Sequence, residues 1–202
     1  MERAREERIG LMSGVRAIGL LSVCMLPFAA ALAGEPAART ATIDACSLLD
    51  SAQIQKVLGV PVDKGSRRDS GVESNGAYSS ACVWMLESER DRRADPKAPL
   101  GGRSFVILNA LRYPQGSSGA KSYLEGFREA SASGVLPSRP SPRKLGDEAL
   151  WWGDGLAVRR RDVGFGISVF LPRDASKGQP GEREGQLATT VLARLAEQDS
   201  AR

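Results

Sequence analysis

The residue types that most often carry catalysis are poorly represented in this chain of 202 residues, and histidine is missing from it. Its absence excludes the Ser-His-Asp triad, the Cys-His dyad and every metal site built on imidazole. Two serines precede a lysine by three residues, in the pairs Ser118–Lys121 and Ser141–Lys144. That spacing can activate a serine on one helical turn. Ser118 is better explained as a helix cap and Ser141 lies in a proline-rich stretch, so neither pair is favoured as a catalytic one.

Asp147 and Glu148 are a pair of acidic residues just before an expected strand. Adjacent strand residues face opposite sides, so the two carboxylates cannot easily share one site, and a role in a turn or at the strand entry is favoured. No glycine-rich phosphate loop follows a strand, and nothing resembles a calcium loop. We therefore expect no cofactor and no metal, and a non-enzymatic protein is the favoured interpretation.

The candidate binding residues are aromatic and cationic. A ligand pocket could have its floor formed by Trp84, Trp151 and Trp152, although packing in the core and at its edge is favoured for these rings. An anion could bind near a hairpin turn at Arg159, Arg160 and Arg161, although a solvated run of charge that protects a sheet edge is favoured there. With 28 basic and 24 acidic residues mixed along the chain, the net charge of +4 does not indicate a nucleic-acid partner.

The N-terminal residues 1–33 have the pattern of a cleavable signal peptide, read from either Met1 or Met12. Arg16 precedes an uncharged apolar stretch that ends in Ala31-Leu32-Ala33, so we expect cleavage after Ala33. The stretch is shorter than the roughly 20 apolar residues of a membrane-spanning helix, which predicts a mature form without a transmembrane span. The mature protein is expected in the periplasm or secreted into the medium.

Cys24 raises the alternative of a lipid anchor, because the residues before it resemble a lipobox. Val23 is larger than that motif allows, so anchoring through Cys24 is the less favoured interpretation. Cleavage after Ala33 leaves two cysteines, Cys46 and Cys82, which most simply form one disulfide in an oxidising compartment.

Apolar periodicity divides the mature chain into a leader (34–43), one domain (44–197) and a tail (198–202). Asp50 and Gln53 form a capping-box pattern at the start of the first helix, which we expect to end at Gly59. The expected strands are 78–86, 104–113, 148–152, 156–160 and 163–171, and the other expected helices follow residues 119 and 185. We expect loops at 60–76, 87–103, 131–144 and 172–185. The order α-β-β-α-β-β-β-α predicts an α+β fold, an antiparallel sheet with helices on one face.

Several of these motifs together resemble a family of small exported bacterial proteins of unknown function, many of them actinobacterial lipoproteins. The likeness covers residues 44–196, and it includes Asp44-Ala-Cys46-Ser-Leu-Leu49, Cys82-Val-Trp84 and 145–149 (Leu-Gly-Asp-Glu-Ala). In that family a cysteine opens the first helix and a Cys-x-Trp motif lies on the first strand. The element order is similar to the PsbP/Mog1-like sandwich, with the beta-lactamase-inhibitor-protein fold as a second candidate. The resemblance implies no particular activity.

We expect an exported, non-enzymatic binding or accessory module of the cell envelope, whose partner is an envelope protein or a small ligand. The alternatives are a small enzyme or inhibitor directed at the envelope, and a structural envelope protein. A convergent cleft with an arginine would favour a small ligand, and an open apolar sheet face would favour a protein partner.

Overall fold

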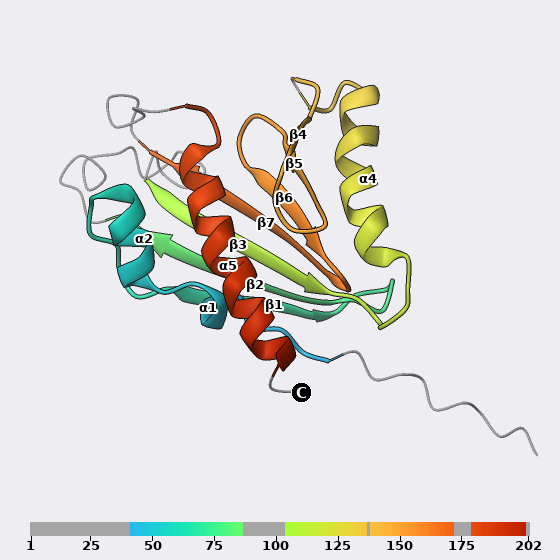
Figure 1. Cartoon of the computed structure of the whole chain (residues 1–202), viewed down its shortest axis with the longest axis horizontal. Coiled ribbons are helices and arrows are strands. Elements are labelled where there is room, and N and C mark those ends of the chain that lie inside the picture. Colours follow the sequence, from blue (N-terminus) through green and yellow to red (C-terminus); the bar gives the residue numbers. More distant parts are fainter. Residues whose placement is uncertain (1–40, 87–103, 137, 172–178, 201–202) are drawn as a thin grey trace, which may run out of the picture. The chain divides into compact units, whose positions relative to one another are not determined.

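The computed structural model describes residues 41–86, 104–136, 138–171 and 179–200, which belong to one compact unit (Figure 1). The expected signal peptide, the leader up to residue 40 and the expected loop at 87–103 lie outside these residues. The helices are α1 (Ala45–Leu48), α2 (Ser51–Leu58), α4 (Gly119–Ala132) and α5 (Glu182–Ser200). The strands are β1 (Ser66–Val72), β2 (Tyr78–Met85), β3 (Phe105–Arg112), β4 (Ser141–Arg143), β5 (Glu148–Trp151), β6 (Leu156–Arg160) and β7 (Val163–Phe170).

Seven strands form one antiparallel sheet in the order β1-β2-β3-β7-β6-β5-β4. This confirms the expected α+β class with an antiparallel sheet. The central pair is β3 and β7, in which Val106 lies opposite Val169 and Ala110 lies opposite Phe165. Residues 105–108 (Phe-Val-Ile-Leu) are apolar on both faces of β3, a pattern typical of a covered, central strand.

The order of elements differs from the expected one, because β1 and β4 form in the segments 60–76 and 131–144 that were expected to be loops. Both strands lie at the edges of the sheet. The side chains of β1 are mostly exposed, and β4 contains Pro142, which only an edge strand tolerates well. An edge strand can be held by main-chain pairing alone, so the hydrophobic pattern that reveals central strands does not reveal these two.

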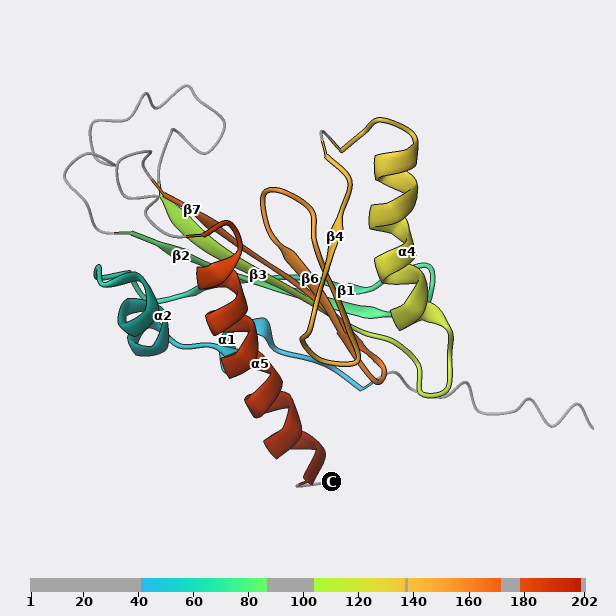
Figure 2. The ribbon, with the colours of Figure 1, turned by 45° about the horizontal axis from the view of Figure 1, so that its top comes forward.

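The helices cover both faces of the sheet, and the prediction that they all lie on one face is wrong. Leu187 and Val191 of α5 belong to the same core cluster as Phe165, together with residues of α1 and α2. The rings of α4 lie on the other face, where Tyr123 covers Gly164 and Gly166 of β7. Figures 1 and 2 show α5 beside α1 and α2, with α4 over the far end of the sheet. These two glycines make room for a helix that the periodicity alone could not place on a face.

Capping interactions define both ends of α2. Asp50 accepts a hydrogen bond from the Gln53 amide, and the Gln53 side chain accepts one from the Asp50 amide, which confirms the expected capping box. Gly59 ends α2 in the left-handed conformation with φ of 71°, as expected. At the other end of the chain α5 continues to Ser200, past the expected domain end at residue 197.

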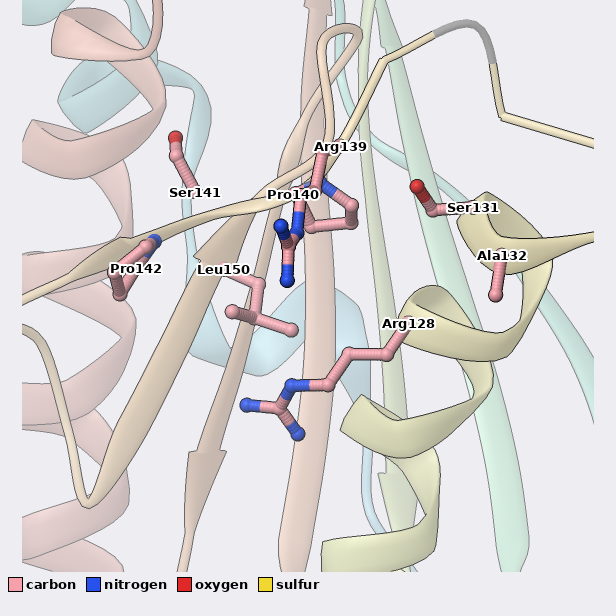
Figure 3. A pocket seen from close by; sticks show the side chains of 8 residues that line it. All are labelled: Arg128, Ser131, Ala132, Arg139, Pro140, Ser141, Pro142 and Leu150. Carbon is pink, nitrogen blue, oxygen red and sulfur yellow. The ribbon is translucent and has the colours of Figure 1, made fainter. Parts of the chain in front are cut away.

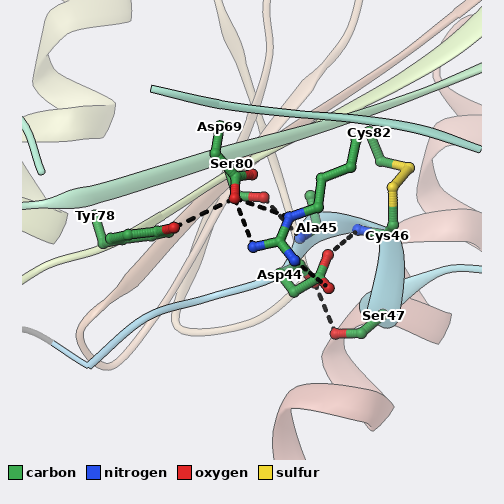
Figure 4. Close-up of polar contacts among 9 residues, drawn as sticks. Asp44, Ala45, Cys46, Ser47, Asp69, Tyr78, Ser80 and Cys82 are labelled. Carbon is green, nitrogen blue, oxygen red and sulfur yellow. Dashed lines mark hydrogen bonds and ion pairs between the residues drawn. A yellow bond between two sulfur atoms is a disulfide. The ribbon is translucent and has the colours of Figure 1, made fainter. Parts of the chain in front are cut away.

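The Cys46–Cys82 disulfide is present and joins α1 to β2, with the two Cα atoms 5.1 Å apart (Figure 4). Gly65 passes directly over it, because a Cβ at this position would lie 2.7 Å from the Cys82 sulfur. Beside the disulfide, Arg67 of β1 pairs with Asp44 at 3.0 Å and with Asp69 at 2.5 Å. The edge strand is therefore fixed to the start of α1 by charge as well as by its pairing with β2.

Candidate functional site

The three tryptophans lie in three different surroundings. Trp84 is buried in the main core at 1% exposure, where it packs close to Gly65. Trp151 packs against the same core and over Gly181, and it lines a small hollow of about 270 Å³ at the start of α5. Trp152 lies in a separate cluster under α4 and stacks on Phe127 with ring centroids 4.8 Å apart. The structure does not bring these rings together as the floor of one pocket.

Two of the three consecutive arginines, Arg160 and Arg161, make ion pairs that hold the end of the sheet to α5. Arg160 donates to the Leu192 carbonyl at 2.8 Å, and its guanidinium lies 3.7 Å from Asp199. Arg161 stands at the hairpin turn with φ of 52° and pairs with Asp199 at 3.2 Å. Arg159 faces the opposite side of the sheet and pairs with Asp147 at 3.1 Å. Carboxylates thus already occupy the positions around these guanidinium groups where an anion would bind.

Asp147 and Glu148 meet at one guanidinium, although their adjacency in sequence argued against a shared site. Asp147 precedes β5, so it is free to turn towards Arg159, and its carboxylate also accepts the Arg161 amide at 2.6 Å. Glu148 lies 3.7 Å from Arg159 and also pairs with Arg128 of α4. The pair has the strand-entry role that the sequence favoured, and it connects α4 to the sheet.

A larger hollow of about 930 Å³ opens between the last turns of α4 and the edge strand β4 (Figure 3). Its wall includes Arg128, Ser131, Arg139, Pro140, Pro142 and Leu150. In Figure 3 the guanidinium groups of Arg128 and Arg139 extend from opposite sides towards Leu150. Leu150 and Pro142 are paired across β4 and β5, so they place an apolar surface beneath two cations.

The two arginines of this hollow differ in their partners. Arg128 pairs with Glu125 at 2.5 Å and with Glu148, and its hydrogen bond to Glu148 raises its pKa. Arg139 is exposed and makes no ion pair or hydrogen bond to any residue that the structure describes. No periodic pattern in the sequence indicates Arg139, because it lies in a proline-rich segment. The place of Arg139 beside the hollow depends on the pairing of β4 with β5, which the sequence does not indicate.

The remaining candidate chemistry is not assembled among the described residues. Ser141 accepts a hydrogen bond from Arg143 at 3.1 Å, and Ser118 stands at the N-cap of α4 without a side-chain capping bond. In the described ranges no three acidic, cysteine or histidine side chains gather where they could hold a metal ion. None of the helices in those ranges is long and apolar enough to cross a membrane.

Comparison of this chain with protein-family models, with curated proteins and with solved structures gave no match. Its function is therefore inferred from the geometry of the hollow between α4 and β4.

Proposed function

We propose that this chain is a non-enzymatic binding module that works outside the cytoplasm, and that the hollow between α4 and β4 holds an anionic ligand with an apolar part. The observation that carries the proposal is Arg139, an exposed cation without a partner among the described residues, on the wall of a hollow of about 930 Å³. Small-molecule sites are commonly concave, mostly apolar, and oriented by a few polar groups.

The two arginines would have different roles toward such a ligand. Arg139 supplies a free guanidinium, which can form a bidentate pair with a carboxylate or a phosphate. Arg128 is held in place by Glu125 and Glu148, which already balance its charge, so it shapes the wall of the hollow and leaves Arg139 as the group that attracts the anion. Pro142 is exposed and lies beside the nearly buried Leu150, so the proline gives an alkyl chain or ring a surface to contact. The combination favours an amphipathic anion over a fully hydrated one.

The test uses the full chain and three matched six-carbon probes: hexanoate, hexyl phosphate and hexanol. We expect the two anions to raise the thermal unfolding temperature and to titrate calorimetrically, and hexanol to do neither. Replacing Arg139→Ala should weaken binding of the anions about tenfold or more, because a charge-assisted hydrogen bond is lost.

Arg143→Ala is the matched control, since Arg143 lies on the edge strand β4 that closely follows Arg139 and is exposed but does not line the hollow. Equal losses in the Arg139 and Arg143 variants would show only a general effect of charge. If hexanol bound as tightly as hexanoate and hexyl phosphate, the negative charge of the ligand would have no role, which would contradict the proposal. Chemical conversion of a bound probe, followed by mass spectrometry, would instead favour the alternative of a small enzyme.

The export of this chain is part of the proposal. The Cys46–Cys82 disulfide supports it, because disulfides persist in oxidising compartments. We further propose cleavage after Ala33, membership of the exported bacterial family that the sequence resembles, and a PsbP/Mog1-like arrangement of the sheet. The mass of the protein recovered from its native envelope tests the first of these: a mature form that begins at residue 34 supports it, and a lipid on Cys24 would contradict it.

A further inference from the structure

A second hollow, of about 520 Å³, lies on the other side of α4, near the start of the helix. Its wall includes Asn75, Tyr113, Ser117, Ser118, Ser122 and Tyr123. Positions 119, 122 and 126 of α4 face it, whereas positions 128, 131 and 132 face the hollow beside β4, as the helical repeat of 3.6 residues requires. The two hollows are therefore separate sites.

Tyr113 is the buried polar residue of this second hollow. It is 5% exposed, and its ring lies under the first residue of α4, where a Cβ on Gly119 would come within 2.2 Å of it. Its hydroxyl makes no hydrogen bond to any residue in the part of the chain that the structure describes. Although most of the residue is buried, its hydroxyl oxygen opens on the hollow, where a ligand hydroxyl can take the place of solvent.

Gly126 is the second, independent indication. It lies in the interior of α4, where glycine is less favourable than alanine, and a Cβ there would meet no atom within 4 Å. Packing explains Gly119 and Gly164, because a side chain at either would collide with a tyrosine ring. No contact among the described residues explains Gly126, which instead leaves the helix backbone bare on the wall of the hollow. Such a bare surface allows a ligand to approach closely.

The polar groups of this hollow are neutral and can both donate and accept hydrogen bonds. The residues of its wall are serines, tyrosines, glycines and one asparagine, without a lysine or an arginine. Asn75 uses its side-chain oxygen to accept the Ala77 amide at 2.9 Å, so its amino group is directed elsewhere. The negative charge of Glu73 acts on Tyr113, so it would also repel an anion bound in this hollow. Hydroxyl and amide groups beside aromatic rings suit a ligand that carries many hydroxyl groups.

We propose that the hollow formed by Tyr113, Tyr123 and the Gly119–Gly126 side of α4 binds a neutral polyhydroxylated ligand, such as one or two sugar rings. The Tyr113 hydroxyl, the Ser118 hydroxyl and the Asn75 amino group bind the ligand hydroxyls, and the sugar ring lies against Gly126. This site does not depend on the anion site proposed beside β4, so either proposal can fail while the other stands.

The test is a titration of the isotopically labelled full chain, followed by amide NMR. The probes are methyl glucoside, N-acetylglucosamine and maltose, with glucose 6-phosphate and glucuronate as charged analogues. We expect at least one neutral sugar to shift amide signals of residues 117–126. Tyr113→Phe keeps the ring and removes the hydroxyl, and it should weaken that binding about tenfold. Gly126→Ala should weaken binding to a similar extent while it raises the unfolding temperature.

Glu129→Ala is the control, because Glu129 is an exposed residue of the same helix that lines neither hollow. It should leave sugar binding unchanged. The absence of any shift at millimolar sugar would overturn the proposal, and so would full binding by both the Tyr113 and Gly126 variants. Tighter binding of glucose 6-phosphate than of methyl glucoside would overturn it in favour of an anion at the start of α4.

Discussion

Glu184 and Asp69 are two carboxyl groups whose pKa values this fold shifts in opposite directions. Burial at the start of α5 raises the pKa of Glu184, which is 7% exposed, and the amides of Glu184 and Val169 oppose that shift only in part. Hydrogen bonds from Arg67 and then Ser80 lower the pKa of Asp69. Each shift makes the free energy of unfolding depend on pH, with opposite signs.

The Glu184→Gln variant should gain stability relative to the native chain as pH rises. The raised pKa means that the contribution of Glu184 is fully present below its unfolded value of 4.5 and is lost as pH rises through the folded pKa. Glutamine resembles the protonated form and carries no such loss. Urea unfolding of both chains from acidic to neutral pH measures the difference, and a difference that does not vary with pH would contradict this account.

Asp69→Asn should behave in the reverse way. The lowered pKa means that Asp69 stabilises the fold above its unfolded value of 3.8, and that this contribution is lost as pH falls through the folded pKa. The variant should therefore be less stable than the native chain at neutral pH and equal to it in strong acid. Because Asp69 and Arg67 are both partly exposed, salt should reduce the neutral-pH difference. If the variant remained less stable than the native chain in strong acid, the loss would come from packing rather than from charge.

Two interior glycines, Gly126 of α4 and Gly164 of β7, should respond to alanine in opposite ways: one through helix propensity and the other through overpacking. In the Gly164→Ala variant the new Cβ would lie 2.7 Å from the Tyr123 ring, so we expect a loss of about 1–3 kcal/mol from overpacking. In Gly126→Ala the Cβ meets open space, and we expect a gain of up to about 1 kcal/mol from helix propensity. Denaturant unfolding measures both, and a Gly164→Ala variant as stable as the native chain would mean that Tyr123 of α4 does not lie over β7 as described.

The central strands and the helices could be predicted from the sequence because burial leaves a periodic mark. The alternation around Cys82 and Trp84 in β2 and the apolar run in β3 are of this kind. The face that α4 covers could not be predicted, since it depends on two glycines that have no side chain to follow. The arginines that the sequence offered as binding residues, 159–161, do not line the candidate site. Arg139 was not predictable, because its place beside α4 depends on the edge strand β4.

At the scale of the whole molecule, a chain of charges links α4 to the end of α5 through the sheet. Arg128 joins Glu148, and Asp147 joins the turn at Arg161, which pairs with Asp199. Exposed ion pairs of this kind each contribute little. We expect the Cys46–Cys82 disulfide, which joins α1 to β2, to have the larger effect on stability.

Replacing both cysteines, Cys46→Ser with Cys82→Ser, should lower the free energy of unfolding by about 3–4 kcal/mol, the chain-entropy value for a loop between residues 36 apart. The native chain with its thiols reduced should unfold at the same denaturant concentration as the double variant. A reduced chain as stable as the oxidised one would mean that the bridge does not constrain the unfolded state.

The central position of β3 and β7 also has a consequence for how this protein reaches its native state. β3 spans residues 105–112, but its neighbour in the sheet, β7, is completed only at residue 170, and α5 follows after that. Pairings between segments so distant in the chain form slowly, and the first half has an unpaired apolar strand until they form. A ribosome would have to release nearly the whole polypeptide before the sheet could close.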